Sequence, residues 1–94
     1  MNALTIEQIN EGLQQLSGWV YDDNNIVKKI EVTDFIEAIG VIVMLAFEAE
    51  KMNHHPTIEN TYNKIIIRLS THDASGITEK DFALAKKIDN LVSE

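Results

Sequence analysis

The stretch FIEAIGVIVMLAFEAEKMNHHP, residues 35–56, decides the fold of this chain. Its middle is apolar on every side of a helix, and it ends at the only proline of the sequence. A residue that precedes proline is pushed out of the helical region, so the helix must stop by His55. The sequence therefore predicts a helix over residues 35–53, with Thr33 or Asp34 as its N-cap.

The apolar helix also predicts self-association. A helix that is apolar all round must be covered all round. A chain of 94 residues makes one domain, residues 1–94, with a single modest core, and such a domain rarely covers both sides of one helix. We therefore predict that the outer face of helix 35–53 packs on a second copy of the chain, in a dimer or tetramer. Deep burial of this helix within a monomer is the alternative.

Upstream of this helix the sequence predicts one helix and two strands. The first helix begins at a capping box that Thr5 opens, and it ends at Gly18. Strand-like runs follow over residues 19–21 and 26–33, joined by a turn of aspartates and asparagines. Trp19, in the first run, is a candidate for stacking on a flat ligand, and a core position is the alternative.

Downstream of Pro56 the sequence predicts a second hairpin and a last helix. The segments 57–62 and 64–71 are strand-like and meet at Asn63, a residue that tolerates positive φ. After a loop, Thr78 caps an amphipathic helix. The order is therefore helix, two strands, helix, two strands, helix. It indicates an α+β fold with a four-stranded antiparallel sheet covered on one face by helices.

Composition excludes several classes of function. Fifteen acidic and eight basic residues give a net charge of −7, which repels phosphate backbones, so we expect no direct nucleic-acid binding. The chain has no cysteine, which removes disulfides, thiolate nucleophiles and zinc-thiolate sites. The longest apolar run is about half of the ~20 residues that a membrane helix needs. Because we also find no signal-peptide pattern, we expect a soluble, cytoplasmic protein with no membrane partner.

The candidate site is the corner where the long helix ends. His54 and His55 are adjacent, and they face one pocket only if the backbone turns between them, as a helix exit does. Glu50 lies four positions before His54, which places a carboxylate beside the imidazole if the helix persists that far. His72 follows a separate strand and reaches this corner only through the fold. Clustered titratable groups of this kind are what an acid–base site requires.

This spacing resembles the signature of the pterin-4a-carbinolamine dehydratase family. The positions that fit the signature are Glu50, His54, His55, Pro56, Tyr62, His72 and Asp81. Three positions depart from the usual pattern: Ile58 stands where the family commonly has tryptophan, and Ile30 and Val32 where it often has phenylalanine. These departures concern the pocket wall and substrate breadth, because the polar set is complete.

The resemblance implies an activity and a fold. The activity is dehydration of 4a-hydroxytetrahydropterin to the quinonoid dihydropterin, the recycling step after an aromatic amino acid hydroxylase has used its pterin. The implied fold is an αββαββα subunit assembled as dimers or tetramers, and the family needs no metal and no organic cofactor. Some animal members also bind a dimeric homeodomain transcription factor, and nothing in these residues carries that role over.

The residue types suit this reaction, because loss of a hydroxyl next to ring nitrogens needs one proton given and one proton taken. Histidine titrates near neutrality and does both. We expect His54 and His72 to exchange protons with the substrate, and His55 to hold the ring or assist. Glu50 would orient His54 or bind the amide and amino edge of the pterin. Asp81 would orient His72 or bind substrate.

Alternatives remain for residues and function alike. Pro56 and Trp19 are candidates for orienting or binding substrate, but a helix end explains the first and a core position the second. Asp81 also completes a capping box with Thr78. Two other functions are open. One is a zinc site of three imidazoles and a carboxylate. The other is a non-enzymatic module that docks a partner protein on helix 35–53.

Overall fold

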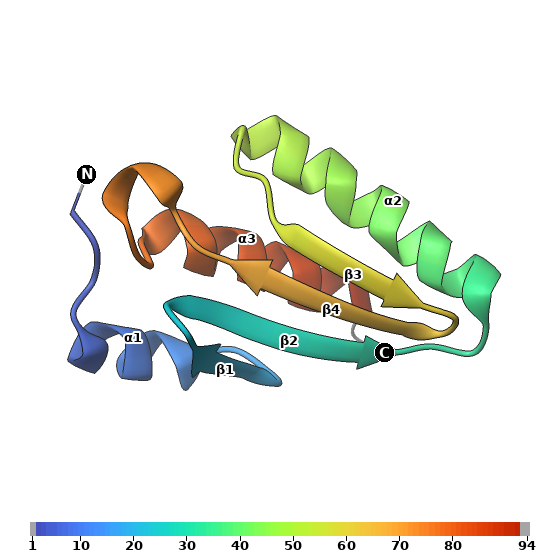
Figure 1. Ribbon diagram of the computed structural model, residues 1–94, viewed down its shortest axis with the longest axis horizontal. Helices are drawn as coiled ribbons and strands as arrows, with labels where there is room; N and C mark the ends of the chain where they lie inside the picture. The colour runs from blue at the N-terminus through green and yellow to red at the C-terminus, as the bar shows by residue number, and fades with distance from the viewer. Residues whose placement is uncertain (1, 93–94) are drawn as a thin grey trace.

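The computed structural model describes residues 2–92 as three α-helices, one 3-10 helix and four strands. In chain order these are α1 (Ile6–Leu13), β1 (Trp19–Asp22), β2 (Asn25–Glu31), α2 (Phe35–Met52), β3 (Thr57–Thr61), β4 (Lys64–Leu69), the 3-10 helix η1 (His72–Ala74) and α3 (Glu79–Val92) (Figure 1). The predicted α+β class and the αββαββα order are confirmed.

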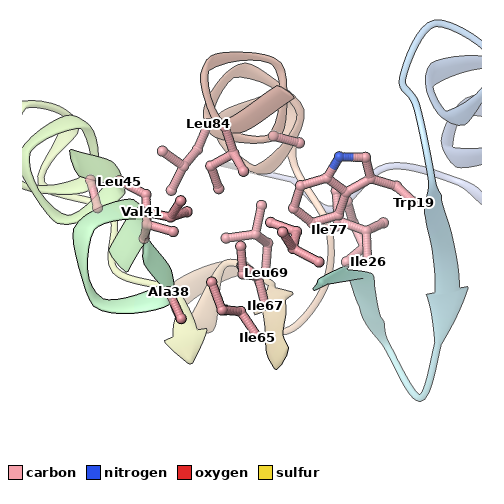
Figure 2. Close-up of a cluster of buried hydrophobic side chains, with 14 of the residues drawn as sticks. Trp19, Ile26, Ala38, Val41, Leu45, Ile65, Ile67, Leu69, Ile77 and Leu84 are labelled. Atoms are coloured by element: carbon pink, nitrogen blue, oxygen red, sulfur yellow. The ribbon is translucent and has the colours of Figure 1, made fainter. Parts of the chain in front are cut away.

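The four strands form one antiparallel sheet in the order β1-β2-β4-β3. The two central strands, β2 and β4, pair from Ile26 opposite Leu69 to Glu31 opposite Lys64. In Figure 2, α3 lies over β4 and α2 flanks it, with the core side chains between the helices and the sheet. The sheet is therefore covered on one face, as predicted.

A single cluster of buried side chains fills the space between the helices and the sheet (Figure 2). Alternate residues of a strand share a face, and Ile65, Ile67 and Leu69 of β4 are all fully buried. Opposite them lie Leu45 of α2 and Leu84 of α3, which are also fully buried. Because one cluster includes side chains from all three helices, we propose that the whole chain forms the predicted single domain.

A mostly buried ion pair ties α3 to the sheet. Nζ of Lys28 lies 2.6 Å from Oδ1 of Asp89, and the two side chains are 11% and 16% exposed. The same carboxylate accepts hydrogen bonds from the Trp19 indole N–H (2.8 Å) and the Ser17 backbone N–H (3.0 Å). Lys28 also donates to the Ser17 carbonyl at 2.8 Å. One side chain of α3 thereby holds β1, β2 and the segment that leads into β1.

The outer face of α2 carries apolar side chains that nothing in residues 2–92 covers. Its inner face is buried, with Ala38 and Leu45 fully inaccessible. On the outer face Ile36 is 78% exposed and Phe47 is 65% exposed. We call the outward row of Ile36, Ile39, Val43 and Phe47 the outer stripe. Burial of this helix within a monomer, the alternative from the sequence, is wrong because these side chains reach solvent.

The turn between β3 and β4 differs from the prediction. The positive φ falls on Tyr62 (φ 52), not on Asn63. The Asn63 amide is instead used elsewhere, since it donates to the Val32 carbonyl at 3.0 Å. Its own carbonyl accepts the Val32 N–H at 2.9 Å. Asn63 therefore ties this turn to the segment after β2, a long-range role that local turn chemistry does not reveal.

No helix in the described part of the chain is long and apolar enough to cross a membrane. The cytoplasmic location stays a prediction from the sequence.

Candidate active site

The end of α2 turns His54 into the protein. Asn53 adopts a left-handed conformation (φ 50, ψ 45), which asparagine tolerates. The His54 N–H then bonds to the Ala49 carbonyl and the Asn53 N–H to the Glu50 carbonyl, both at 3.0 Å. These two bonds form a Schellman motif. The chain thus leaves the helix before His54, earlier than Pro56 alone requires, and the imidazole is only 8% exposed.

The buried imidazole of His54 is paired with Asp81. Nε2 of His54 lies 2.6 Å from Oδ1 of Asp81, whose side chain is fully buried. The other carboxylate oxygen accepts the Thr71 hydroxyl at 2.9 Å and the Thr78 backbone N–H at 2.8 Å. Since both oxygens act as acceptors, the hydrogen-bond network assigns a proton to Nε2 of His54.

Glu50 pairs with a different histidine from the one predicted. The predicted partner is His54, but Oε1 of Glu50 lies 2.9 Å from Nε2 of His55, with both side chains well exposed. The reason is the left-handed Asn53. It breaks the helical i, i+4 relation that would have set His54 above Glu50.

His72 reaches the same corner from the other side. It is the first residue of η1, directly after β4, and its side chain is exposed. The predicted partner Asp81 is taken by His54, and the His72 ring makes no hydrogen bond within the described residues. The expectation that Asp81 orients His72 is therefore wrong. The ring nitrogens of His72 are therefore accessible and engaged by no side chain or backbone group of the described residues.

A hollow of about 280 Å³ brings the three histidines together. The residues that line it are Asn53, His54, His55, Ser70, Thr71, His72, Asp73 and Lys80. A larger hollow, about 380 Å³ between α1 and α3, is lined by no histidine. Residues 53–55, before the hairpin of β3 and β4, and residues 70–73, after it, thus line one cavity.

The four other expected site residues do not line this hollow. Trp19 is buried in the core, with its indole N–H bonded to Asp89, so the core alternative describes it (Figure 2). Pro56 is half-buried between His55 and β3, where it fixes the direction of the chain. Glu50 and Asp81 act from outside the lining, each through the histidine that it contacts.

Sequence reasoning missed several polar residues at the hollow. Lys80, Ser70 and Asn53 line it, and Thr71 both lines it and binds Asp81. The available signal was their position directly beside His72, Asp81 and His54 along the chain. Adjacency alone does not separate a lining residue from a solvent-facing one, because that depends on where the loop and α3 meet.

Among residues 2–92, no three His, Asp or Glu side chains are grouped so as to hold a metal ion. Glu50 and Asp81 are engaged by different histidines, so the carboxylates and imidazoles do not converge on one point. The geometry of the described residues therefore gives no support to the alternative of a zinc site.

Fold and site together define a class: a small α+β domain of αββαββα order with a hollow lined by three histidines, one of which pairs with a buried carboxylate. The family model described as pterin 4 alpha carbinolamine dehydratase matches residues 2–91, and the chain belongs to that family. The resemblance noted from the sequence is confirmed.

Relatives cover nearly the whole chain. A protein of Christiangramia forsetii is 45% identical over 92 residues, which cover 98% of this chain and 95% of that protein. One from Sulfurisphaera tokodaii is 44% identical over 93 residues, 99% of this chain and 100% of the relative. Both carry the name "Putative pterin-4-alpha-carbinolamine dehydratase". The crystal structure of a transcriptional coactivator/pterin dehydratase from Brucella melitensis superposes with a TM-score of 0.95 at 36% identity, covering 98% of this chain and 100% of that one.

Proposed function

We propose that this chain dehydrates a 4a-hydroxytetrahydropterin to the quinonoid dihydropterin, with histidines as the acid–base groups. Family membership and the names of the relatives support the hydro-lyase reaction itself. The observation that carries the proposed mechanism is the single hollow lined by His54, His55 and His72.

The reaction needs two proton transfers and no redox step. The bond from C4a to the hydroxyl oxygen breaks, that oxygen receives a proton and leaves as water, and a ring nitrogen gives up its proton. The products are the quinonoid ring and one water molecule. Positioned acid–base groups contribute about 10²–10⁴-fold to such a step. The hollow supplies imidazoles at its wall, where both transfers take place.

His54 is the proposed proton acceptor. Asp81 accepts a hydrogen bond from the Nε2–H group of His54, so the neutral ring has its lone pair on Nδ1. Nδ1 has no hydrogen-bond partner among the described residues. It is also not buried, since every fully buried side-chain nitrogen or oxygen there has a partner. Because His54 lines the hollow, Nδ1 faces the place where substrate would bind.

His72 and His55 have the other roles. The His72 side chain is exposed and its ring makes no hydrogen bond in the described part of the chain, so the ring is free to donate a proton to the departing hydroxyl. His55 is held by Glu50 at 2.9 Å, which suits holding the pterin ring or assisting a transfer. Asp81 and Glu50 thus act as positioning residues, and Pro56 fixes the turn that separates the two rings.

The test is a dehydration assay with enzymatically generated hydroxypterin. We expect His54→Ala and His72→Ala each to lower kcat/KM by about 10²-fold or more while the protein stays folded. Asn10→Ala, an exposed change on α1 away from the hollow, is the control and should keep full activity. Normal turnover in both histidine variants would remove the proposed roles.

We also propose that the outer stripe of α2 packs on a second copy of the chain. Monomers rarely leave such a continuous apolar row in water, and Val43 and Phe47 also border a shallow apolar hollow. Phe47→Glu should convert the assembly to monomer in sedimentation at micromolar concentration. Ile6→Glu, which also replaces an exposed apolar side chain but on α1, should not. A wild-type monomer at that concentration would contradict the proposal.

A second candidate function is docking of another protein on the same stripe. The observation in its favour is the exposure of the stripe, together with the coactivator role in the name of the Brucella melitensis protein. The dehydration assay discriminates, because a docking module with a vestigial pocket would show no turnover even with all three histidines intact.

A further inference from the structure

We propose that Thr71 and Thr78 are positioning residues that hold Asp81, and through it His54, in one orientation and one tautomer. The inference rests on the proposed acid–base role of His54. It concerns two hydroxyl groups whose hydrogen bonds go to each other and to Asp81.

A directed chain of hydrogen bonds ends on Asp81. Oγ1 of Thr71 donates to Oδ2 of Asp81 at 2.9 Å, which uses the single hydroxyl proton of that threonine. Oγ1 of Thr78 lies 2.6 Å from Oγ1 of Thr71, so in this contact Thr78 must be the donor. The remaining lone pair of Thr78 accepts the Lys80 backbone N–H at 3.3 Å. All donors in the chain thus point towards the carboxylate.

This series of hydrogen bonds is buried, so water does not replace its donors or acceptors. Thr71 is 6% exposed, Thr78 2% and Asp81 0%. No fully buried side-chain nitrogen or oxygen in residues 2–92 lacks a partner. Leaving a buried donor or acceptor without a partner is costly, so the network has one low-energy arrangement. In that arrangement Oδ1 of Asp81 is left for Nε2 of His54 alone.

Helix capping does not account for these contacts. Capping of α3 uses the Thr78 hydroxyl oxygen as the acceptor of the Lys80 backbone N–H and the Asp81 carboxylate as the acceptor of the Thr78 N–H, and both contacts are present. It needs neither the Thr71 hydroxyl nor His54. Thr71 comes from the end of the sheet, directly before η1, and His54 from the end of α2. The network therefore joins three separate segments at one carboxylate and makes the tautomer of His54 depend on all of them.

The experiment compares Thr71→Val, which keeps the shape and removes the hydroxyl, with Thr71→Ser, which keeps the hydroxyl. We expect Thr71→Val to lower kcat by about 10- to 100-fold with little change in KM, because misplacing a catalytic group costs rate more than binding. Nitrogen-15 spectra of histidine-labelled protein should show the wild-type His54 ring protonated on Nε2. In Thr71→Val part of that signal should move to the Nδ1–H form, and Thr71→Ser should restore both readouts.

Two further variants complete the test. Thr78→Val leaves the bond from Thr71 to Asp81 in place, so kcat should fall only about threefold, with a smaller tautomer change. Thr61→Val, on the exposed edge strand β3, should match the wild type in both readouts. A folded Thr71→Val protein with the wild-type tautomer and kcat would overturn the inference. If Thr71→Val does not fold, Thr78→Val with wild-type values in both readouts overturns it.

The tautomer measurement needs no turnover, so it separates the two proposals. If His54→Ala keeps full activity, the proposed role of His54 fails, yet the spectra still report whether the threonines fix its ring.

Discussion

Replacing Asp81 with asparagine keeps the shape of the buried side chain and removes one of its two acceptor oxygens. The carboxylate accepts three hydrogen bonds, from His54 at one oxygen and from Thr71 and Thr78 at the other. An asparagine has one acceptor oxygen and one NH2 group, so one side of it must present donors instead. The outcome depends on which way the amide turns.

In one orientation the amide oxygen faces His54 and the NH2 group faces the Thr78 backbone N–H, a donor that cannot turn around. That buried N–H would lose its acceptor at a cost of about 1–3 kcal/mol. In the other orientation the oxygen keeps the bonds to Thr71 and Thr78, and the NH2 group faces His54. The ring then accepts at Nε2 and carries its proton on Nδ1. We expect this second orientation to dominate because the buried Thr78 backbone N–H keeps its acceptor.

The expected magnitudes follow from that choice. His54 would present a donor to the hollow in place of a lone pair, and loss of a positioned base costs about 10²–10⁴-fold in rate. An aspartate-to-asparagine change beside a catalytic histidine acts through the wrong tautomer in the same way. Stability should change less, by about 1–2 kcal/mol for weakened charge-assisted bonds. In a domain of this size that lowers Tm by roughly 4–16 °C.

Asp89→Asn is the matched control in the same dehydration and thermal-denaturation assays. Asp89 is also a poorly exposed aspartate of α3 that accepts several hydrogen bonds, from Lys28, Trp19 and Ser17, and it does not contact a histidine. The control should lose a similar amount of stability and keep kcat within about twofold, because distant sites act independently. Wild-type kcat in Asp81→Asn, or an equal loss of activity in Asp89→Asn, would refute the reasoning.

Three further substitutions test individual features of the fold by urea or thermal denaturation at fixed protein concentration. Asp89→Ala leaves the Lys28 ammonium unpaired in a mostly buried place, so the free energy of unfolding should fall by about 3 kcal/mol. Gly12→Ala would place a Cβ 2.6 Å from the Phe82 ring, and the clash should outweigh the ~1 kcal/mol that alanine gains in a helix. Asn53→Ala should cost about 1 kcal/mol and reduce kcat, because its left-handed backbone disfavours alanine, whereas Asn53→Gly should keep both. Wild-type stability in any of the three alanine variants would contradict the contact that it tests.

The order of elements was predictable because local signals agreed along the chain. Thr5 and Asp34 cap helices where the sequence places them, and α2 ends before Pro56 as predicted, whereas α1 ends at Leu13 and not at the predicted Gly18. Strand alternation gave the inward face of β4. These features depend on neighbours within a few residues, which a single sequence displays directly.

The meeting of the histidines in one hollow followed from the family spacing, but their partners did not. Sequence spacing paired Glu50 with His54 because it assumed four residues of unbroken helix. Because the chain leaves the helix at Asn53, Glu50 pairs with His55, and His54 pairs with Asp81. Partners that lie 27 residues apart, as His54 and Asp81 do, are set by how α2 and α3 dock. No local rule supplies that docking.

Trp19 and Asn63 show the same limit. Each has a side chain whose local chemistry permits several uses, a stacking surface for the first and a positive-φ turn for the second. Distant partners decide between them: Asp89 for the indole and Val32 for the amide. A buried polar group needs a hydrogen-bond partner, and that partner often comes from a distant part of the chain. Only the folded structure shows which of the possible uses of such a side chain occurs.

The two faces of α2 have different surroundings. Its inner row packs against the sheet and α3, while no side chain in the described part of the chain covers its outer stripe. A substitution on the outer row therefore changes what the subunit meets without changing how it folds. Because the proposed catalytic corner lies at the last turn of the same helix, we expect related chains to be able to change their partners on the outer stripe without changing the histidines at the helix end.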